Sequence, residues 1–209
     1  MENTYEVVIL ANGLFPKKKR LLDIIHNAPM LICCDGAASH LYEFGKTPNY
    51  VIGDMDSISS SLKELWKDLL IYKTDQNTND LTKAVEFCIE KGFKNIAILG
   101  AGGLREDHAL ANISLLHLYL PLVEHVEMIS DFGTFTPICK TQQFKSKKGE
   151  QVSIFSLTPS TIISTQGLKF PICSSQLSSW WEASLNQSEG EKFTIHLESV
   201  GKILVYQCF

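Results

Sequence analysis

The sequence lacks the features that mark several specialised classes of protein. Among its 209 residues, no apolar run approaches the roughly 18 residues that a membrane-spanning helix requires. It has six cysteines but no CxxC pair of the kind that binds structural zinc, and the adjacent Cys33 and Cys34 cannot form an ordinary disulfide. No secretory apolar segment opens the chain. We therefore expect reduced, buried thiols and a cytoplasmic location, with no membrane partner.

An excess of positive charge is also absent. The formal net charge is −4 and the isoelectric point is near 5.9, which argues against nucleic acid or an anionic membrane as a partner. The only basic run, Lys17–Arg20, fits a solvated loop or a first helical turn, and a patch that attracts phosphate is the alternative. With 44% hydrophobic residues, the chain can bury the core of one large domain or two modest ones.

Apolar, β-branched runs alternate with helical patterns over the first 135 residues. The expected strands are Tyr5–Leu10, Met30–Cys34, Tyr50–Ile52, Ile96–Leu99 and Val126–Ile129. The expected helices are Lys18–Asn27, Ala37–Phe44, Ser60–Leu69, Asn79–Lys91 and His108–Leu120. Apolar strands that alternate with helices are typical of a mostly parallel sheet covered on both faces. We therefore predict an α/β domain over residues 1–135.

The composition changes after about residue 135. Ser, Thr, Gln and Gly become frequent and separate short β-type runs. These runs are Gln151–Leu157, Thr161–Ser164, Phe193–Leu197 and Ile203–Tyr206. They predict a small antiparallel sandwich or barrel-like domain over residues 136–209.

Polar motifs follow the expected strands at the edge where a parallel α/β sheet binds its ligands. They are Asn12 after the first strand, Asp35-Gly36 after the second, Asp54 and Asp56 after the third, and Gly100–Gly103 after a later one. Loops and helix N-termini converge at that edge, so we expect these motifs to form one site.

Two carboxylates lie two residues apart in the stretch VIGDMDSI. If the segment is extended, Asp54 and Asp56 point to the same side, and each raises the pKa of the other unless a cation compensates. No Lys or Arg lies within six residues of them, so the spacing favours a hard cation, and Mg²⁺ with oxygen ligands fits best. The alternative is a turn in which Asp56 and Ser57 cap the following helix.

A second acidic segment, Thr74–Asp80, opens the helix expected at 79–91, with Asn79 or Thr78 as its N-cap. Asp80 in a first turn can simply complement the helix dipole. The alternative is that Asp80 adds a third carboxylate to the metal site, with Lys83 one turn later reaching toward a phosphate.

The segment GAGGLREDH, Gly100–His108, lies between a strand and a helix. Its glycines allow backbone N–H groups to approach a phosphate closely, and Arg105 can bind two phosphate oxygens at once. Asp107 and His108 can orient the arginine or bind metal. The segment matches neither the Walker A pattern nor the Rossmann glycine pattern. A tight turn capped by Asp107 is the alternative.

In order and spacing, these motifs resemble the signature blocks of the thiamine pyrophosphokinase family. The matching blocks are DGA at Asp35–Ala37, GDMDSI at Gly53–Ile58, DQNTNDLTKA at Asp75–Ala84, GAGGLREDHALANISLL at Gly100–Leu116, GLKFPI at Gly167–Ile172 and ASLNQ at Ala183–Gln187. The resemblance implies transfer of the pyrophosphoryl group of ATP to the hydroxyethyl oxygen of thiamine, giving thiamine diphosphate and AMP. It also implies a three-layer α/β/α domain that binds ATP and Mg²⁺, a thiamine-binding C-terminal β-sandwich, and a homodimer with active sites at the subunit interface.

Carried onto this sequence, the resemblance implies a role for each matched residue. The metal ligands are Asp54, Asp56 and Asp80, which act in catalysis together with Arg105. The nucleotide and its phosphates are bound by Asn12, Asp35, Gly36, Lys83, Gly102, Gly103, Arg105, Asp107 and His108. Thiamine is bound by Gln76, Ser184 and Asn186, with Trp181 or its neighbour Trp180 as an aromatic wall for the cationic thiazolium ring.

The sequence departs from the family pattern at three places. Leu104 stands where many members have a second glycine before the arginine, and Phe170 stands where Trp or Tyr is frequent. The loop at residues 12–16 matches only loosely. Two other functions use the same acidic motifs: a metal-dependent phosphohydrolase, and a module that senses nucleotide or thiamine without catalysis.

Overall fold

Six parallel strands form the sheet of the first of two compact units, which divide between Asp131 and Phe132 in a computed structural model that describes residues 5–209. Their order is β6-β5-β1-β2-β3-β4. The strands are β1 (Val7–Leu10), β2 (Leu31–Cys34), β3 (Tyr50–Gly53), β4 (Leu70–Tyr72), β5 (Asn95–Leu99) and β6 (His125–Ile129). Every residue of β1 and β2 is buried, as expected for strands with both faces covered.

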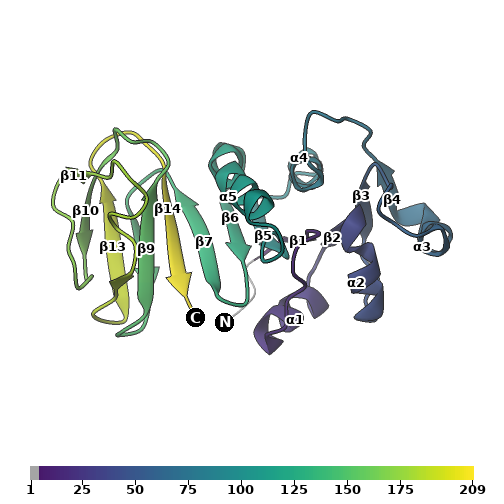
Figure 1. Ribbon diagram of the computed structural model, residues 1–209, viewed down its shortest axis with the longest axis horizontal. Coiled ribbons are helices and arrows are strands. Elements are labelled where there is room, and N and C mark those ends of the chain that lie inside the picture. Colours follow the sequence, from purple (N-terminus) through teal and green to yellow (C-terminus); the bar gives the residue numbers. More distant parts are fainter. Residues whose placement is uncertain (1–4) are drawn as a thin grey trace. The chain divides into compact units, whose positions relative to one another are not determined.

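Helices cover both faces of this sheet, so the predicted three-layer α/β/α architecture is confirmed (Figure 1). The helices are α1 (Lys19–His26), α2 (Ala38–Glu43), α3 (Ser60–Leu65), α4 (Asp80–Glu90) and α5 (Glu106–Tyr119), with 3₁₀ turns at Asp35–Ala37, Lys67–Leu69 and Leu120–Leu122. Helices α1, α2 and α3 pack on one face against side chains such as Val8, Cys33 and Val51. Helix α4 packs on the other face over β1 to β3, and α5 packs there over β6.

Two helices begin at side-chain caps. The side chain of Asn79 accepts from the Thr82 N–H at 2.9 Å, which confirms one of the two expected caps of α4. Ser59 caps α3 by accepting from the Leu62 N–H at 3.4 Å. The interpretation that Asp56 and Ser57 cap this helix is therefore wrong.

The sequence did not predict β4. The helix expected at Ser60–Leu69 ends at Leu65, and the chain then turns into this three-residue strand at the edge of the sheet. The strand is short and partly exposed, and the apolar run that contains it, Leu69–Tyr72, begins with a residue that the sequence assigned to the end of the preceding helix.

The second unit is an antiparallel sandwich, as predicted. One of its sheets has the order β12-β9-β14-β7, and the other has the order β11-β10-β13-β8. The strands are β7 (Gly133–Ile138), β8 (Gln142–Lys145), β9 (Gln151–Ser156), β10 (Ile162–Gln166), β11 (Ser175–Gln176), β12 (Asn186–Gln187), β13 (Lys192–Leu197) and β14 (Ile203–Cys208). Side chains from both sheets form one core, which includes Val152, Ile154, Phe193 and Ile203.

Four strands of this unit, β7, β8, β11 and β12, were not among the predicted ones. The predicted domain boundary after residue 135 falls within β7. Within residues 5–209, no helix combines the length and apolarity that crossing a membrane requires.

Candidate active site

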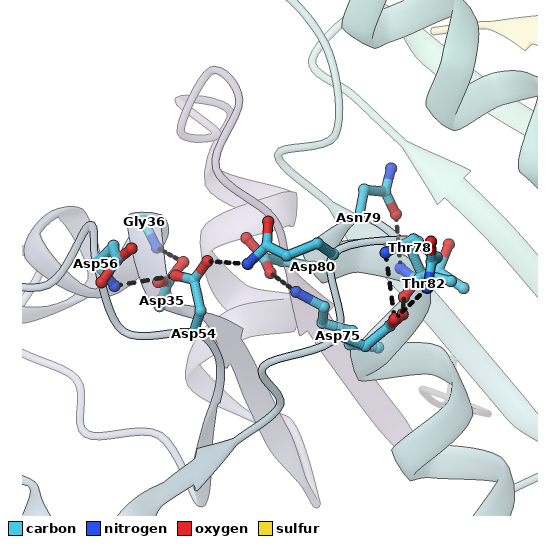
Figure 2. Close-up of polar contacts among 12 residues, drawn as sticks. Asp35, Gly36, Asp54, Asp56, Asp75, Thr78, Asn79, Asp80 and Thr82 are labelled. Carbon is cyan, nitrogen blue, oxygen red and sulfur yellow. Dashed lines mark hydrogen bonds and ion pairs between the residues drawn. The ribbon is translucent and has the colours of Figure 1, made fainter.

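The acidic motifs of the first unit lie at the carboxyl ends of its strands, where sequence reasoning expected them. Asp35 begins the 3₁₀ turn after β2, Asp54 and Asp56 follow β3, and Asp80 begins α4. Figure 2 shows Asp54 between Asp56 and Asp80, with Asp35 beside it. The electrostatic influence of Asp80 and Asp54 on Asp35 confirms that three of the four carboxylates lie close enough to interact.

Asp35 is the buried member of this group, with 2% of its surface exposed. Its Oδ1 accepts from the Gly36 N–H at 2.6 Å, whereas its Oδ2 is buried and makes no hydrogen bond of ordinary geometry to any residue in 5–209. Burial, followed by the charge of Asp80, raises the pKa of Asp35. A buried carboxylate oxygen without a partner is a place where a cation or a donor of a ligand would be stabilised.

Asp54 and Asp56 lie in a turn and not in an extended segment. Strand β3 ends at Gly53, and the buried Met55 has a φ of 68°, which is in the left-handed region. Asp54 Oδ1 accepts from the Asp56 N–H at 3.0 Å, which is the side-chain-to-backbone bond of an Asx turn. The expectation that extended backbone places both carboxylates on one side is therefore wrong. In this turn Asp54 lies beside Asp35 (Figure 2).

Lys83, which the sequence analysis expected to reach toward a phosphate, is paired with a carboxylate of the site. It is 4% exposed, and its Nζ lies 3.0 Å from Asp80 Oδ1, one helical turn away on α4. Its charge also contributes to lowering the pKa of Asp54, after the larger effects of the Asp56 N–H and the Gln76 side chain. The carboxylates therefore already have one positive partner, although none lies within six residues of Asp54 or Asp56.

The loop before α4 is organised by its own carboxylate. Asp75 accepts from the Asn77 backbone at 3.2 Å, the Asn77 side chain at 2.8 Å and the Thr78 hydroxyl at 2.9 Å (Figure 2). This arrangement places Gln76 so that its Nε2 donates to Asp54 Oδ2 at 3.4 Å. Gln76 therefore lies at the acidic cluster.

The glycine segment after β5 is held by the loop after β1. The Gly13 N–H donates to the Gly100 carbonyl at 2.5 Å, and the Leu14 N–H donates to the Gly102 carbonyl at 2.8 Å. Gly103 has a φ of 84°, and a Cβ there would lie 2.9 Å from Leu14 Cβ, so this position requires glycine. The two loops form one backbone platform at the edge of the sheet.

Asn12 reaches the neighbouring acidic turn from this platform. A Cβ at Gly36 would lie 2.1 Å from Asn12 Nδ2, so the side chain of Asn12 lies directly against Gly36. The residue that matched the family pattern least well is thus in contact with the DGA segment.

Arg105 and Asp107 form a two-pronged ion pair. Arg105 Nε donates to Asp107 Oδ1 at 3.1 Å, and Arg105 Nη2 donates to Asp107 Oδ2 at 2.6 Å. Asp107 does not cap α5: the helix begins after Arg105, and Asp107 Oδ1 accepts from the N–H of the adjacent His108. The ion pair, followed by that N–H, lowers the pKa of Asp107. Arg105 remains largely exposed, and its orientation is set by Asp107.

In the second unit, Asn186 is 4% exposed and is engaged by backbone groups. Its Nδ2 donates to the Phe170 carbonyl at 2.7 Å, while its Oδ1 accepts from the N–H groups of Phe170 at 3.1 Å and Gln187 at 2.8 Å. Ser184 Oγ donates to the Trp181 carbonyl at 2.7 Å. These side chains hold the segments that present Phe170 and Trp181, which are 60% and 76% exposed.

The remaining aromatic candidate, Trp180, is anchored. Its indole N–H donates to the Ser156 carbonyl at 3.2 Å, and its ring centroid lies 5.7 Å from that of Phe155. Leu185, between Ser184 and Asn186, has a φ of 58° and is 75% exposed. A non-glycine residue in this conformation is strained, and such strain is frequent at ligand-binding sites.

Within residues 5–209, no three Asp, Glu, His or Cys side chains are gathered as a ready metal site. The donor set nevertheless fits Mg²⁺, because this ion typically binds one or two carboxylates and completes its shell with water and phosphate oxygens. Asp54, Asp80 and the unpartnered oxygen of Asp35 offer such ligands.

Sequence reasoning missed two residues at this site, Gly53 and Asn112. Gly53 was given no role beyond its place in the block GDMDSI, and Asn112 lies within a helix whose other residues are mostly apolar. The only signal for Asn112 was its place inside the block GAGGLREDHALANISLL.

Comparison with known proteins identifies relatives of both units. Residues 21–128 match the family model "Thiamin pyrophosphokinase, catalytic domain", and residues 133–206 match "Thiamin pyrophosphokinase, substrate-binding domain". Thiamine pyrophosphokinase 1 of Oryza sativa is 27% identical over 205 residues, covering 83% of this chain and 76% of the rice protein. The Arabidopsis thaliana protein of the same name is 25% identical over 227 residues, covering 93% of this chain and 83% of its own.

Solved structures share the fold. The thiamin pyrophosphokinase family protein of Enterococcus faecalis superimposes with a TM-score of 0.83 at 18% identity, covering 98% of this chain and 99% of its own. Thiamin pyrophosphokinase from Candida albicans superimposes with a TM-score of 0.81 at 19% identity, covering 98% of this chain and 89% of its own.

Proposed function

The chain belongs to the thiamine pyrophosphokinase family, and we propose that its acidic site carries out the family's reaction with ATP and Mg²⁺. In this reaction the hydroxyethyl oxygen of thiamine attacks the β-phosphorus of ATP. The new O–P bond forms as the bond from the β-phosphorus to the oxygen of the α-phosphate breaks, and AMP leaves. The observation that carries the proposal is the match of both family models, in order, on a chain whose carboxylates and glycine segment meet at one sheet edge.

The first requirement of this reaction is to hold a polyphosphate that carries four negative charges. Asp54 and Asp80, with Asp56 and the free oxygen of Asp35 in support, would hold Mg²⁺, which when bound neutralises phosphate charge and aligns the reacting oxygens. One of the clustered carboxylates would accept the proton of the thiamine hydroxyl group.

The second requirement is donors for the phosphate oxygens. The backbone platform supplies N–H groups at Gly102 and Gly103. Gly36, whose own N–H is engaged by Asp35 Oδ1, would contribute by letting the nucleotide approach the backbone of the acidic turn closely. Arg105, already oriented by Asp107, has the planar fork that binds two oxygens of the transferring group. The remaining nucleotide contacts that we propose are Asn12, Lys83, Asp107 and His108.

The third requirement is a surface for thiamine. Trp181 is exposed and can pack its ring on the cationic thiazolium, and Ser184 lies one turn from it. Asn186 is buried and bonded at both ends of its amide to backbone groups, so we assign it to holding Phe170 in place and not to direct contact. Gln76, which donates to Asp54, would face the hydroxyethyl group as it approaches the metal.

We further propose that the protein is a homodimer with its active sites at the subunit interface. Helix α5 carries exposed apolar side chains: Leu110 and Leu118 are 54% and 51% exposed in the single chain. Apolar side chains on a helix tend to be covered by a partner when the chain itself does not cover them. Sedimentation equilibrium would show a monomer if this proposal is wrong.

A cytoplasmic location also remains our proposal. The cysteines of the sheet and α4, Cys33, Cys34 and Cys88, are buried and free, and burial raises their pKa values, that of Cys88 to about 12. Thiols in this state do not require an oxidising compartment. The expectation of buried thiols is wrong for Cys139 and Cys173, which are free but exposed.

The deciding experiment is incubation of the protein with ATP, Mg²⁺ and thiamine, followed by chromatography of the products. We expect thiamine diphosphate and AMP in equal amounts. ADP and inorganic phosphate formed without thiamine would instead establish a phosphohydrolase. Tight binding of nucleotide or thiamine by calorimetry with no turnover would establish a sensing module.

A further inference from the structure

A relay of side-chain amides joins the start of α4 to the glycine segment. Asn79 Nδ2 donates to Asn112 Oδ1 at 3.0 Å, and Asn112 Nδ2 donates to the Ala101 carbonyl at 2.8 Å. Asn79 Oδ1 in turn accepts from the Thr82 N–H at 2.9 Å (Figure 2). The relay therefore runs from the backbone of α4, through two asparagines, to the backbone of the glycine segment.

The direction of this relay is determined by its two ends. The Thr82 N–H can only donate, so the oxygen of Asn79 must face it and the NH₂ group must face Asn112. The Ala101 carbonyl can only accept, so the NH₂ group of Asn112 must face it and the oxygen must face Asn79. Each asparagine uses both ends of its amide, and Asp, Ser or Ala at position 112 could not make both bonds.

The two ends of the relay are also the two halves of the proposed phosphate site. Asn79 immediately precedes Asp80, and Ala101 immediately precedes Gly102 and Gly103. Because Asn112 lies on α5 and Asn79 caps α4, the relay sets the distance between a carboxylate-bearing loop and a phosphate-binding loop that are otherwise on separate elements. A polyphosphate with its metal would have to contact both at once.

We propose, on the basis of the proposed function, that Asn112 is a positioning residue for the metal–nucleotide complex. It acts through Asn79 and Ala101 and does not itself touch a substrate. Its loss should weaken the productive binding of Mg²⁺–ATP and leave the thiamine side unaffected, since a small misplacement of binding groups lowers rates steeply.

The first test is the steady-state kinetics of Asn112→Ala and Asn79→Ser. Asn79→Ser keeps a helix cap but has no amide to reach Asn112. We expect the KM for Mg²⁺–ATP to rise or kcat/KM for it to fall by about 10- to 100-fold in either variant, with the KM for thiamine unchanged. The double variant should be no worse than the more impaired single variant, because both remove the same relay.

The matched control is Asn49→Ala. Asn49 Oδ1 accepts from the N–H of Leu31 at 2.8 Å. Leu31 begins β2, so this bond lies at the amino end of the strand, whereas the site lies at the carboxyl ends. This variant also loses a side-chain-to-backbone hydrogen bond, but we expect wild-type KM values for both substrates.

The second test is hydrogen exchange without substrates, which does not depend on activity. In Asn112→Ala, the amides of residues 75–79 and 101–103 should both exchange faster, while in Asn49→Ala they should not. Unchanged exchange in both loops would overturn the relay, and faster exchange with a wild-type KM for Mg²⁺–ATP would overturn its positioning role. If the wild-type protein makes no thiamine diphosphate, the proposed function fails, but the exchange measurement still decides whether the relay exists.

Discussion

The carboxylate of Asp35 occupies the space in which a side chain at Gly53 would lie. A Cβ at Gly53 would be 2.7 Å from Asp35 Cγ and 3.0 Å from Oδ2. The two residues belong to neighbouring parallel strands, Asp35 directly after β2 and Gly53 at the end of β3. The missing side chain at Gly53 therefore makes room for a buried carboxylate at the centre of the site.

Gly53→Ala should displace Asp35 and reduce activity. Contacts under 3.0 Å cannot be accommodated without movement, and such overpacking costs about 1–3 kcal/mol in the free energy of unfolding. We expect kcat/KM for thiamine diphosphate formation to fall by at least about tenfold, since the displaced carboxylate belongs to the catalytic geometry. Gly190→Ala is the control, because within the described chain a Cβ there meets nothing within 4 Å. Wild-type activity in Gly53→Ala would show that the position of Asp35 does not matter.

Asp35→Asn should stabilise the protein while impairing catalysis. Burial and Asp80 raise the pKa of Asp35 above its ordinary value of 3.8, so the folded state holds the proton more tightly than the unfolded chain does. The free energy of unfolding therefore falls as the pH rises from the ordinary pKa through the raised pKa of the folded state. Asn at this position does not ionise, so the variant does not lose this stability. Without Mg²⁺ or nucleotide we expect a gain of about 1–3 kcal/mol at neutral pH, the cost of a buried, poorly satisfied charge.

Urea unfolding at two pH values measures this effect. The gain of Asp35→Asn should be clear at neutral pH and should shrink below the ordinary pKa, where the carboxyl is protonated in both states. The same substitution at the exposed Asp56 should change stability little. A destabilised Asp35→Asn at neutral pH would contradict the prediction.

Asp54→Asn should abolish the Mg²⁺-dependent reaction. Asn keeps an oxygen that can accept from the Asp56 N–H, so the Asx turn survives, but the negative charge needed by the cation is lost. We expect a loss of about 100-fold or more in kcat, with the melting temperature close to that of the wild type. Activity as a function of Mg²⁺ concentration is the measurement, and a wild-type curve would remove Asp54 from the metal site.

Arg105→Lys should lower activity without affecting stability. Lysine keeps the charge but cannot make the two-pronged contact with Asp107 or bind two phosphate oxygens together. We expect kcat/KM to fall by about 100-fold, and the free energy of unfolding to change by less than about 0.5 kcal/mol because the side chain is exposed. The exposed Lys67, which pairs with Glu64 on the surface, offers a control in Lys67→Ala. Equal effects of the two variants would contradict a catalytic role for Arg105.

Asn186→Asp should damage the thiamine side alone. A carboxylate can still accept from the Phe170 and Gln187 N–H groups but cannot donate to the Phe170 carbonyl, which it would repel. We expect a loss of about 2–3 kcal/mol in unfolding free energy and an increase in the KM for thiamine, with the KM for ATP unchanged. Ser184→Ala, which loses one local hydrogen bond, should cost much less stability. An equal rise in both KM values would show that Asn186 acts through general destabilisation.

The alternation of strands and helices could be predicted from the sequence because it depends on local patterns. The strands β1, β2, β3, β5 and β6 of the first unit are mostly apolar, and turn residues follow them directly, so they were predicted within two residues. The short edge strand β4 and the strands β7 and β8 have weaker local patterns, and pairing with neighbours defines them. The order of the polar motifs along the chain was sufficient to recognise the family, since each follows a strand that ends at the same edge.

By itself, the sequence therefore determined the fold class, the edge that carries the site and the residue types available there. Only the tertiary structure decided that Asp54 and Asp56 lie in a turn at Met55, that the charge of Lys83 acts on Asp54 as well as on Asp80, and that Asn112 joins the two loops. The physical reason is that charge interactions and hydrogen bonds depend on distance in space. Lys83 is 29 residues from Asp54 and Asn112 is 33 residues from Asn79 in the chain, and the folding of the sheet brings these pairs together.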